Sequence, residues 1–173
     1  MTERELRKIR LKNDYEEMKK IRSDVIKWRV LKGEEPYAEV YEVTLNIRTI
    51  IGIQDGKPVY RDKSVVKIEL PETYPFEQPH AYMVTMPQPF HPNWYVSGKG
   101  CFGFWDISES LMSYVYRMAK TVQFQPEYTN PQSPANHDAL PWWFANEKSE
   151  YVPCDKQDIV FFNKEKKINI LSK

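Results

Sequence analysis

A histidine, an asparagine and a cysteine lie in one short segment, and their types and spacing could support acyl transfer. The segment starts at His91-Pro92-Asn93 and reaches Cys101 ten positions after the histidine. A thiol is a good nucleophile and leaving group, because about 3% of an unperturbed cysteine is thiolate at pH 7. Gly98 and Gly100 leave room for an approaching backbone. The segment predicts a nucleophilic cysteine; the alternative is a buried structural cysteine whose glycines serve a turn.

The elements that position this loop can be predicted from the spacing of apolar residues. Thr2 and Glu5 predict a capping box at the start of a helix of about five turns. Its expected buried stripe is Leu11, Tyr15, Met18 and Ile21. A short strand is expected at 28–31. From Tyr41 the apolar spacing changes to two, which predicts strands with one solvated face. The residues expected to share the buried face are Tyr41, Val43, Leu45, Ile47, Ile51 and Ile53.

The second half of the chain shows turn signals and then renewed helical spacing. Asp55-Gly56 predicts a hairpin turn, and further strands are expected at 66–70 and 81–86. Six prolines between positions 71 and 92 predict an irregular loop region. Apolar residues then recur at helical spacing over 111–122, with Ser108 as the expected N-cap.

The order of these elements predicts the fold class and the domain boundaries. A further helix is expected within 137–150. We therefore predict an α+β domain with an N-terminal helix, a four-stranded antiparallel meander, an irregular active-site loop and C-terminal helices. Residues 1–150 are assigned to this domain, and residues 151–173 to a C-terminal extension of unknown role.

Composition and charge exclude several classes of function. A net charge of +1 leaves no overall field that would hold nucleic acid. The apolar runs are too short to cross a membrane, and the charged N-terminus lacks the apolar core of a secretion signal. Two cysteines, Cys101 and Cys154, do not form a disulfide framework, and three scattered histidines offer no chelating spacing. We expect a cytoplasmic protein with no metal and no cofactor.

Further motifs surround the cysteine segment in a fixed order. Tyr74-Pro75-Phe76 lies upstream, and Trp105 and the Asn-Pro-Gln-Ser-Pro-Ala-Asn stretch of 130–136 lie downstream. This series resembles the ubiquitin-conjugating enzymes over roughly residues 5 to 150. The resemblance implies that Cys101 accepts a ubiquitin-like protein from an activating enzyme as a thioester. The modifier would then pass to a lysine of a target protein.

The resemblance also implies roles for the residues beside Cys101. His91 would hold the loop through hydrogen bonds rather than act as a base. Asn93 would stabilise an oxyanion or order the loop; a simple turn residue is the alternative. Ser133 aligns with an acidic residue of many family members, and Asp138 is the nearest carboxylate. Both are expected to help a lysine reach and attack the thioester, with a loop cap as the alternative.

Partner surfaces are predicted by the same resemblance. The first helix is basic, and in the family such a helix meets the activating enzyme; Arg4, Arg7 and Lys8 are its candidate residues here. A solvated basic face is the alternative, for this helix and for the lysine-rich tail at 164–167. Phe76 and Trp105 belong to the surface that binds the ligase in relatives.

The sequence departs from the family pattern after the cysteine. Phe102-Gly103-Phe104-Trp105 stands where the family places an apolar residue and an aspartate, and the tryptophan has an unusual spacing from the cysteine. A ligase partner is therefore left open. We hypothesise a distant branch, belonging to a prokaryotic ubiquitin-like conjugation system with antiviral defence as its setting.

Two other functions are compared with this interpretation, and one aromatic motif is interpreted separately. A conjugating-enzyme variant that only binds partners would normally lack the cysteine. A cysteine peptidase would need a base and an orienting residue, but Asn136 and His137 are sequence neighbours and could not easily line up. The aromatic run 142–144 is interpreted as core packing, with a partner-binding patch as the alternative.

Overall fold

Helix α1 (Glu3–Met18) begins at the predicted capping box in the computed structural model, which describes residues 1–161. The Thr2 hydroxyl accepts from the Glu5 amide at 3.2 Å, and the Glu5 carboxylate accepts from the Thr2 amide at 2.7 Å. These bonds satisfy backbone donors that a first helical turn leaves free. The predicted stripe is confirmed as buried, at Leu11, Tyr15, Met18 and Ile21.

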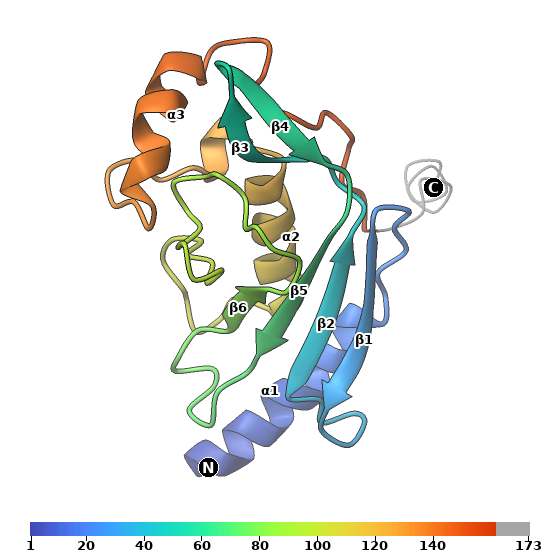
Figure 1. Ribbon diagram of the computed structural model, residues 1–173. Coiled ribbons are helices and arrows are strands. Elements are labelled where there is room, and N and C mark those ends of the chain that lie inside the picture. Colours follow the sequence, from blue (N-terminus) through green and yellow to red (C-terminus); the bar gives the residue numbers. More distant parts are fainter. Residues whose placement is uncertain (162–173) are drawn as a thin grey trace, which may run out of the picture.

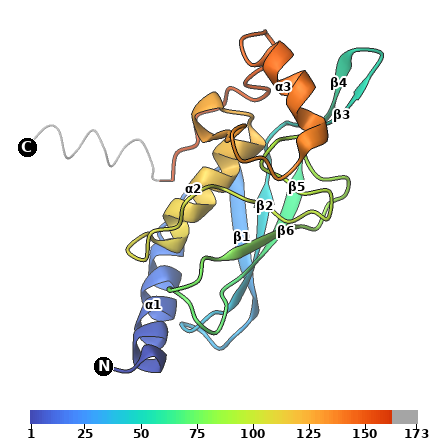
Figure 2. The ribbon, with the colours of Figure 1, turned by 90° about the vertical axis from the view of Figure 1, so that its left-hand side faces the viewer.

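Four antiparallel strands form the main sheet in the order β1-β2-β5-β6. Their bounds are Ile26–Lys32, Val40–Leu45, Ser64–Glu69 and His80–Met83. Burial alternates along β2 and β5, as a sheet with one covered face requires. Helices α1 and α2 (Leu111–Val122) lie on the same side of that sheet and contact each other, and the core fills the space between the helices and the sheet (Figures 1 and 2).

The remaining strands, β3 (Thr49–Gln54) and β4 (Lys57–Arg61), form a separate two-stranded sheet. Asp55 and Gly56 have φ values of 51° and 74° in its two-residue turn, which confirms the predicted hairpin. The prediction that Ile51 and Ile53 continue the buried face of β2 is wrong. The chain leaves the main sheet after Leu45, so the alternation starts again and Ile50 is the buried residue.

Helix α2 confirms the predicted element but not its predicted cap. Ser110 is the N-cap, and its hydroxyl accepts from the Ser113 amide at 3.1 Å. Ser108 instead bonds the carboxylate of Asp106. Two short 3₁₀ turns follow, η1 (Pro126–Tyr128) and η2 (His137–Ala139), and the last helix is α3 (Leu140–Asn146).

Residues 151–161 pack against the body of the molecule. Val152, Ile159 and Phe161 are buried, the last two in the main core. The buried carboxylate of Asp155 accepts from the Arg48 amide at 2.8 Å and from Gln123 Nε2 at 3.2 Å. The predicted basic tail at 164–167 lies outside the described residues. Within residues 1–161, no helix is both long and apolar enough to cross a membrane.

Candidate active site

Cys101 lies at the end of a narrow loop that returns to its own starting point. Tyr95 donates its amide to the Lys99 carbonyl at 2.9 Å, and a β-bridge joins Trp94 to Gly100. One step further, the Cys101 amide donates to the carbonyl of Asn93 at 2.8 Å. The loop therefore places the half-exposed thiol residue directly beside Asn93.

The two glycines before the cysteine are required by the loop itself. Gly98 has a φ of +94°, and a side chain there would lie 3.3 Å from the Met83 carbonyl oxygen. At Gly100 an added Cβ would overlap the ring of Phe102. These contacts are internal to the molecule, so the expected room for an approaching backbone stays a prediction.

His91 is completely buried, and both of its ring nitrogens have partners. Nδ1 accepts from the Asn93 amide at 2.9 Å, so the ring proton sits on Nε2 and points to the Thr129 hydroxyl at 3.1 Å. That hydroxyl in turn donates to the Gln125 carbonyl at 3.2 Å. The ring packs edge-on against Phe124, with 4.5 Å between centroids. Burial lowers the pKa of His91 from 6.5 to about 3, so the ring is a neutral support.

Asn93 is also buried and holds the loop that faces the cysteine segment. Its Nδ2 donates to the Tyr128 carbonyl, and its Oδ1 accepts from the Asn130 amide, both at 3.0 Å. A primary amide has two donor hydrogens, so one hydrogen of Nδ2 lies beyond these two bonds. The side chain can thus order the loop and still donate.

Ser133 and Asp138 lie on a segment that packs against the start of the cysteine loop. The amides of Ala135 and Asn136 both donate to the Pro92 carbonyl, at 2.7 and 3.1 Å. Asn136 caps η2 by accepting from the Asp138 amide at 3.0 Å. The capping side chain is therefore that of Asn136, while Ser133 and Asp138 are exposed to solvent.

Trp105 joins the Tyr74-Pro75-Phe76 turn to the chain that follows the cysteine. Its indole nitrogen donates to the Pro75 carbonyl at 2.8 Å, and its ring lies 5.9 Å from that of Tyr74. Phe76 and Phe104, on either side of this junction, are 53% and 84% exposed. Trp105 itself is half-buried, so the solvent-facing apolar side chains here are the two phenylalanines.

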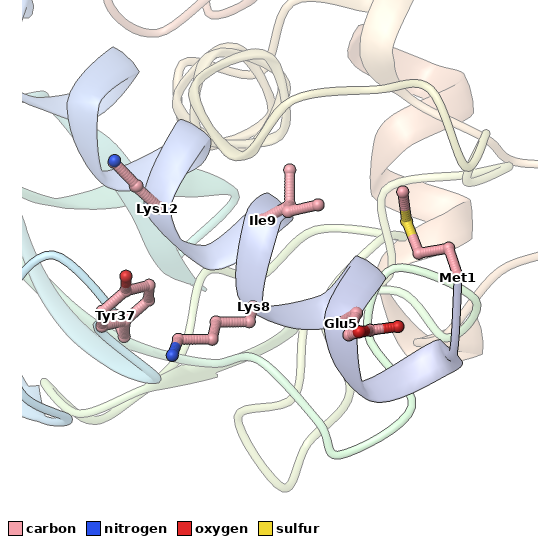
Figure 3. A pocket seen from close by; sticks show the side chains of 6 residues that line it. All are labelled: Met1, Glu5, Lys8, Ile9, Lys12 and Tyr37. Carbon is pink, nitrogen blue, oxygen red and sulfur yellow. The ribbon is translucent and has the colours of Figure 1, made fainter.

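The basic residues of α1 do not all face solvent. Arg7 is used internally, because it donates to the carbonyls of Leu70 and Pro71 and pairs with Glu39 at 3.3 Å. Arg4 and Lys8 are exposed, and the Lys8 ammonium lies 4.9 Å from the centre of the Tyr37 ring. A groove of about 570 Å³ follows this face of α1 (Figure 3). Its lining comprises Met1, Glu5, Lys8, Ile9, Lys12 and Tyr37.

Sequence reasoning missed Arg117 of α2, which contacts the cysteine segment, and its ion-pair partner Glu109, which lies just before that helix. Arg117 donates to the carbonyl of Phe102, the residue after Cys101, and pairs with Glu109 at 2.8 Å. The only signal was a charged residue between Tyr114 and Met118 on the buried side of a helix. Arginine is rarely half-buried without partners, but periodicity does not identify those partners.

The second cysteine is poorly placed for nucleophilic chemistry. The Cys154 thiol donates to the Arg48 carbonyl at 3.2 Å. Burial raises its pKa from 9.0 to about 12, so almost none of it is thiolate at neutral pH. Trp143, of the aromatic run 142–144, is buried in the same small core cluster as Val152, whereas Phe144 is 54% exposed.

Comparisons with known proteins give sequence matches over about half of the chain and a likeness of fold over most of it. No family model matches the chain. A stretch of 95 residues is 33% identical to ubiquitin-conjugating enzyme E2 2 of Kluyveromyces lactis, and equally to that of Saccharomyces cerevisiae. The match covers 53% of this chain and 54% and 52% of those two proteins. The chain thus spans about half the length of the curated relatives it matches.

Two solved structures resemble the chain over a longer stretch. S. cerevisiae Ubc12 has a TM-score of 0.57 at 20% identity and covers 82% of this chain and 73% of its own. Human ubiquitin-conjugating enzyme E2 G1 has a TM-score of 0.52 at 16% identity, covering 70% of this chain and 97% of its own. At these identities the likeness establishes the fold.

Proposed function

We propose that this chain, a divergent member of the ubiquitin-conjugating (UBC) fold, carries a ubiquitin-like protein as a thioester on Cys101 and passes it to a lysine. The observation that carries the proposal is the placement of Cys101. A half-exposed thiol residue stands beside Asn93, at the end of a loop fixed by a buried neutral His91. The sequence match to enzymes named for ubiquitin conjugation supports the same chemistry.

The loading step exchanges one thioester for another. The Cys101 thiolate attacks the carbonyl carbon at the modifier's C-terminus, where that carbonyl is bound to a cysteine of the activating enzyme. A carbon–sulfur bond forms to Cys101, the bond to the activating enzyme breaks, and its thiolate leaves. Because the bond broken and the bond formed are alike, the step is nearly thermoneutral and needs no strong base. The buried His91, with its low pKa, is consistent with this absence of a base.

The transfer step is harder, because the acceptor is an amine. A lysine with a pKa near 10.4 is neutral in only about one molecule in 2,500 at pH 7. The neutral amine attacks the thioester, the amide bond forms, the Cys101 thiolate leaves and the amine's extra proton passes to solvent. In this proposal Asn93 donates to the oxyanion that develops, and Ser133 and Asp138 receive the incoming ammonium from their exposed positions.

Partners follow from the same proposal. The groove on α1, with Arg4 and Lys8 exposed along that helix, is the surface we assign to the activating enzyme. Phe76 and Phe104 offer an apolar surface to a ligase. Trp105 contributes to that surface indirectly, because it holds the Pro75 turn in place.

A loading assay tests the proposed function. Ubiquitin, the yeast ubiquitin-activating enzyme and ATP are suitable probes, since the matched relatives are named for ubiquitin. We expect an adduct on a non-reducing gel that disappears with a thiol reductant. Cys101→Ser should give an adduct that resists the reductant, Cys101→Ala none, and Cys154→Ala the parental amount.

A second probe removes the dependence on the activating enzyme. Ubiquitin bearing a C-terminal thioester of mercaptoethanesulfonate should load Cys101 directly, with release of mercaptoethanesulfonate. An adduct that survives Cys101→Ala and is lost with Cys154→Ala would contradict the assignment. If Cys101 is loaded neither by the activating enzyme nor by the mercaptoethanesulfonate thioester, the proposed function is contradicted for ubiquitin.

A further inference from the structure

One arginine of α2 donates to the backbone carbonyl of the residue that follows the candidate nucleophile. Arg117 donates through Nη1 to the carbonyl of Phe102, the residue that follows Cys101. Its Nε and Nη2 form a two-pronged ion pair with Glu109, at 2.8 and 2.9 Å. The side chains of Arg117 and Glu109 are only 20% and 14% exposed. A shielded bidentate pair fixes the plane of the guanidinium, and so fixes the direction in which Nη1 donates.

Glu109 is in turn held in place by α1. Arg10 donates through Nη2 to the Glu109 carbonyl at 2.6 Å, and through Nη1 to the Ile107 carbonyl. One turn later, the buried carboxylate of Asp14 accepts from the Leu111 amide at 2.9 Å. The segment 107–111 is therefore bonded to α1 at both of its ends. Contacts run without a break from α1 through Glu109 and Arg117 to Phe102.

The backbone is thus hydrogen-bonded on both sides of the cysteine. On the amino-terminal side, its own amide donates to the Asn93 carbonyl at 2.8 Å. On the carboxyl-terminal side, the Phe102 carbonyl accepts from Arg117. Immediately beyond, Gly103 has a φ of +88° and Phe104 is 84% exposed, so the chain turns outward into solvent. The hydrogen bond from Arg117 therefore holds the chain after the cysteine against α2.

We infer that Arg117 is a positioning residue that orients Cys101 for acyl transfer, with Glu109 fixing Arg117 and Arg10 fixing Glu109. The consequence for reaction rate rests on the proposed function, whereas the ordering of the loop does not. A misplacement of reacting groups by about 1 Å can cost up to ~10²-fold in rate. A side chain that never touches the modifier would in this way control its transfer.

Amide hydrogen exchange tests the ordering role without any partner protein. In Arg117→Gln, the Cys101 amide, which donates to the Asn93 carbonyl, should exchange at least about tenfold faster, while the amides of α2 keep their protection. Arg117→Lys keeps the charge and one donor, so its exchange should be intermediate. Arg29→Gln is the matched control. It removes another arginine that pairs through two nitrogens, with Glu42 at 2.9 and 3.3 Å, but on the outer edge of the sheet. In that variant the Cys101 amide should exchange at the parental rate.

The rate role is tested on the ubiquitin-loaded protein by discharge to free lysine. Arg117→Gln should lower the rate at saturating lysine by about 10- to 100-fold. The lysine concentration for half-saturation should not change, because lysine binding is not what Arg117 supports. Glu109→Gln should act in the same direction. The double variant should be no slower than Arg117→Gln alone, since Glu109 acts through Arg117.

The outcomes separate this inference from the proposed function. Parental exchange of the Cys101 amide in Arg117→Gln would overturn the inference, and so would effects of Glu109→Gln and Arg117→Gln that simply add. If the parental chain takes no ubiquitin from either donor, the proposed function fails for ubiquitin, and the exchange data still decide the role of Arg117. Should Arg117→Gln not fold, Arg117→Lys supplies the same comparison.

Discussion

At the scale of single residues, Asn93 combines a supporting role with the chemical role that we propose for it. Its amide holds the Tyr128 carbonyl and the Asn130 amide, and one donor hydrogen lies outside both bonds. A pre-oriented amide donor is worth several kcal/mol when charge develops beside it. The bonds to the Tyr128 carbonyl and the Asn130 amide fix the direction of the remaining N–H of Asn93 before any substrate arrives. Burial strengthens the interaction of that N–H with a charge.

Replacement of Asn93 should therefore separate loading from transfer. Asn93→Ala should still accept ubiquitin, because thioester exchange has a thiolate as both nucleophile and leaving group and needs little help at the oxyanion. Its discharge to free lysine should be about 10²-fold slower, the scale found when one oxyanion donor is lost. Asn93→Asp keeps the acceptor for Asn130 and loses the donor, so it should be slow as well. Single-turnover discharge between pH 7 and 9 measures both variants; parental rates throughout would reduce Asn93 to a turn residue.

Asp138 should show a milder effect with a distinct pH signature. Asp138→Ala removes an exposed carboxylate that we expect to receive the incoming ammonium. Discharge should slow by roughly three- to tenfold at pH 7, and a rise to pH 9 should restore part of it, since more lysine is then neutral. Asp158→Ala, also exposed but on the C-terminal segment, is the control. A defect that is equally deep at both pH values would argue against this role.

The buried imidazole of His91 predicts a loss of stability in mild acid. Its folded pKa of about 3 lies below the unfolded value of 6.5, so the unfolded chain takes up a proton first. Above pH ~6.5, titration of His91 does not lower the free energy of unfolding. As the pH drops from 6.5 toward 3, it lowers this free energy by ~1.4 kcal/mol per pH unit. Urea unfolding at pH 7, 6 and 5 measures this slope. His91→Asn should have a shallower slope, whereas His137→Gln, exposed on η2, should keep the parental one.

At the scale of elements, the sequence predicts best where local chemistry decides. The capping box of α1 and the Asp55-Gly56 turn depend on neighbouring residues only, and both are confirmed. The phase of β3 was mispredicted, because the break after Leu45 is set by where the chain leaves the sheet. Ser110 rather than Ser108 caps α2, since Asp106 takes the Ser108 hydroxyl. Such competition between partners cannot be read from spacing.

The candidate site shows the same division between local and distant contacts. Cys101 and Asn93 are joined by a loop that the local motif predicts, and the structure places them side by side. Arg117 reaches the same loop from a position sixteen residues later, through a contact that depends on how α2 packs. The sequence motif therefore identified the loop residues but not the side chain that holds them from the helical layer.

Helix α1 should bind the activating enzyme through its exposed charges. Reversing Arg4 and Lys8 to glutamate should slow loading by the activating enzyme about five- to tenfold, mainly through slower association. Loading from the mercaptoethanesulfonate thioester of ubiquitin should be unchanged, because that donor needs no docking surface. Reversal of Lys57 and Lys63 to glutamate changes the charge by the same amount and is the control, because both lysines are exposed, on β4 and just after it. Equal losses with both donors would place the defect at Cys101 instead of the docking surface.

At the scale of the whole molecule, the fold is conserved while the sequence diverges. Structural neighbours share only 16–20% of residues with this chain. The pattern of burial in the sheet and helices accounts for this, since many apolar sequences of similar volume can fill one core. The C-terminal segment adds to that core, because Ile159 and Phe161 pack within it and Asp155 bonds both Arg48 and Gln123.

Truncation tests whether the domain ends near residue 150. A chain that stops at residue 150 loses Val152, Ile159 and Phe161, each worth about 1.5–3 kcal/mol when fully buried. We expect its free energy of unfolding to fall by more than ~3 kcal/mol. A chain that stops at residue 161 retains all three residues and serves as the control. Chemical denaturation of both chains measures the difference; equal stabilities would support the boundary predicted from the sequence.

The environment of Cys154 should direct electrophiles to the other cysteine, Cys101. With a pKa of about 12 and its hydrogen directed to the Arg48 carbonyl, this thiol is almost never a thiolate at neutral pH. A maleimide dye or a haloacetamide should therefore modify Cys101 alone in the unaltered chain, with no need to remove the second cysteine. The same selectivity offers a route to stable analogues of the loaded state, in which a modifier with a C-terminal electrophile is fixed to Cys101 by a bond that lysine cannot cleave.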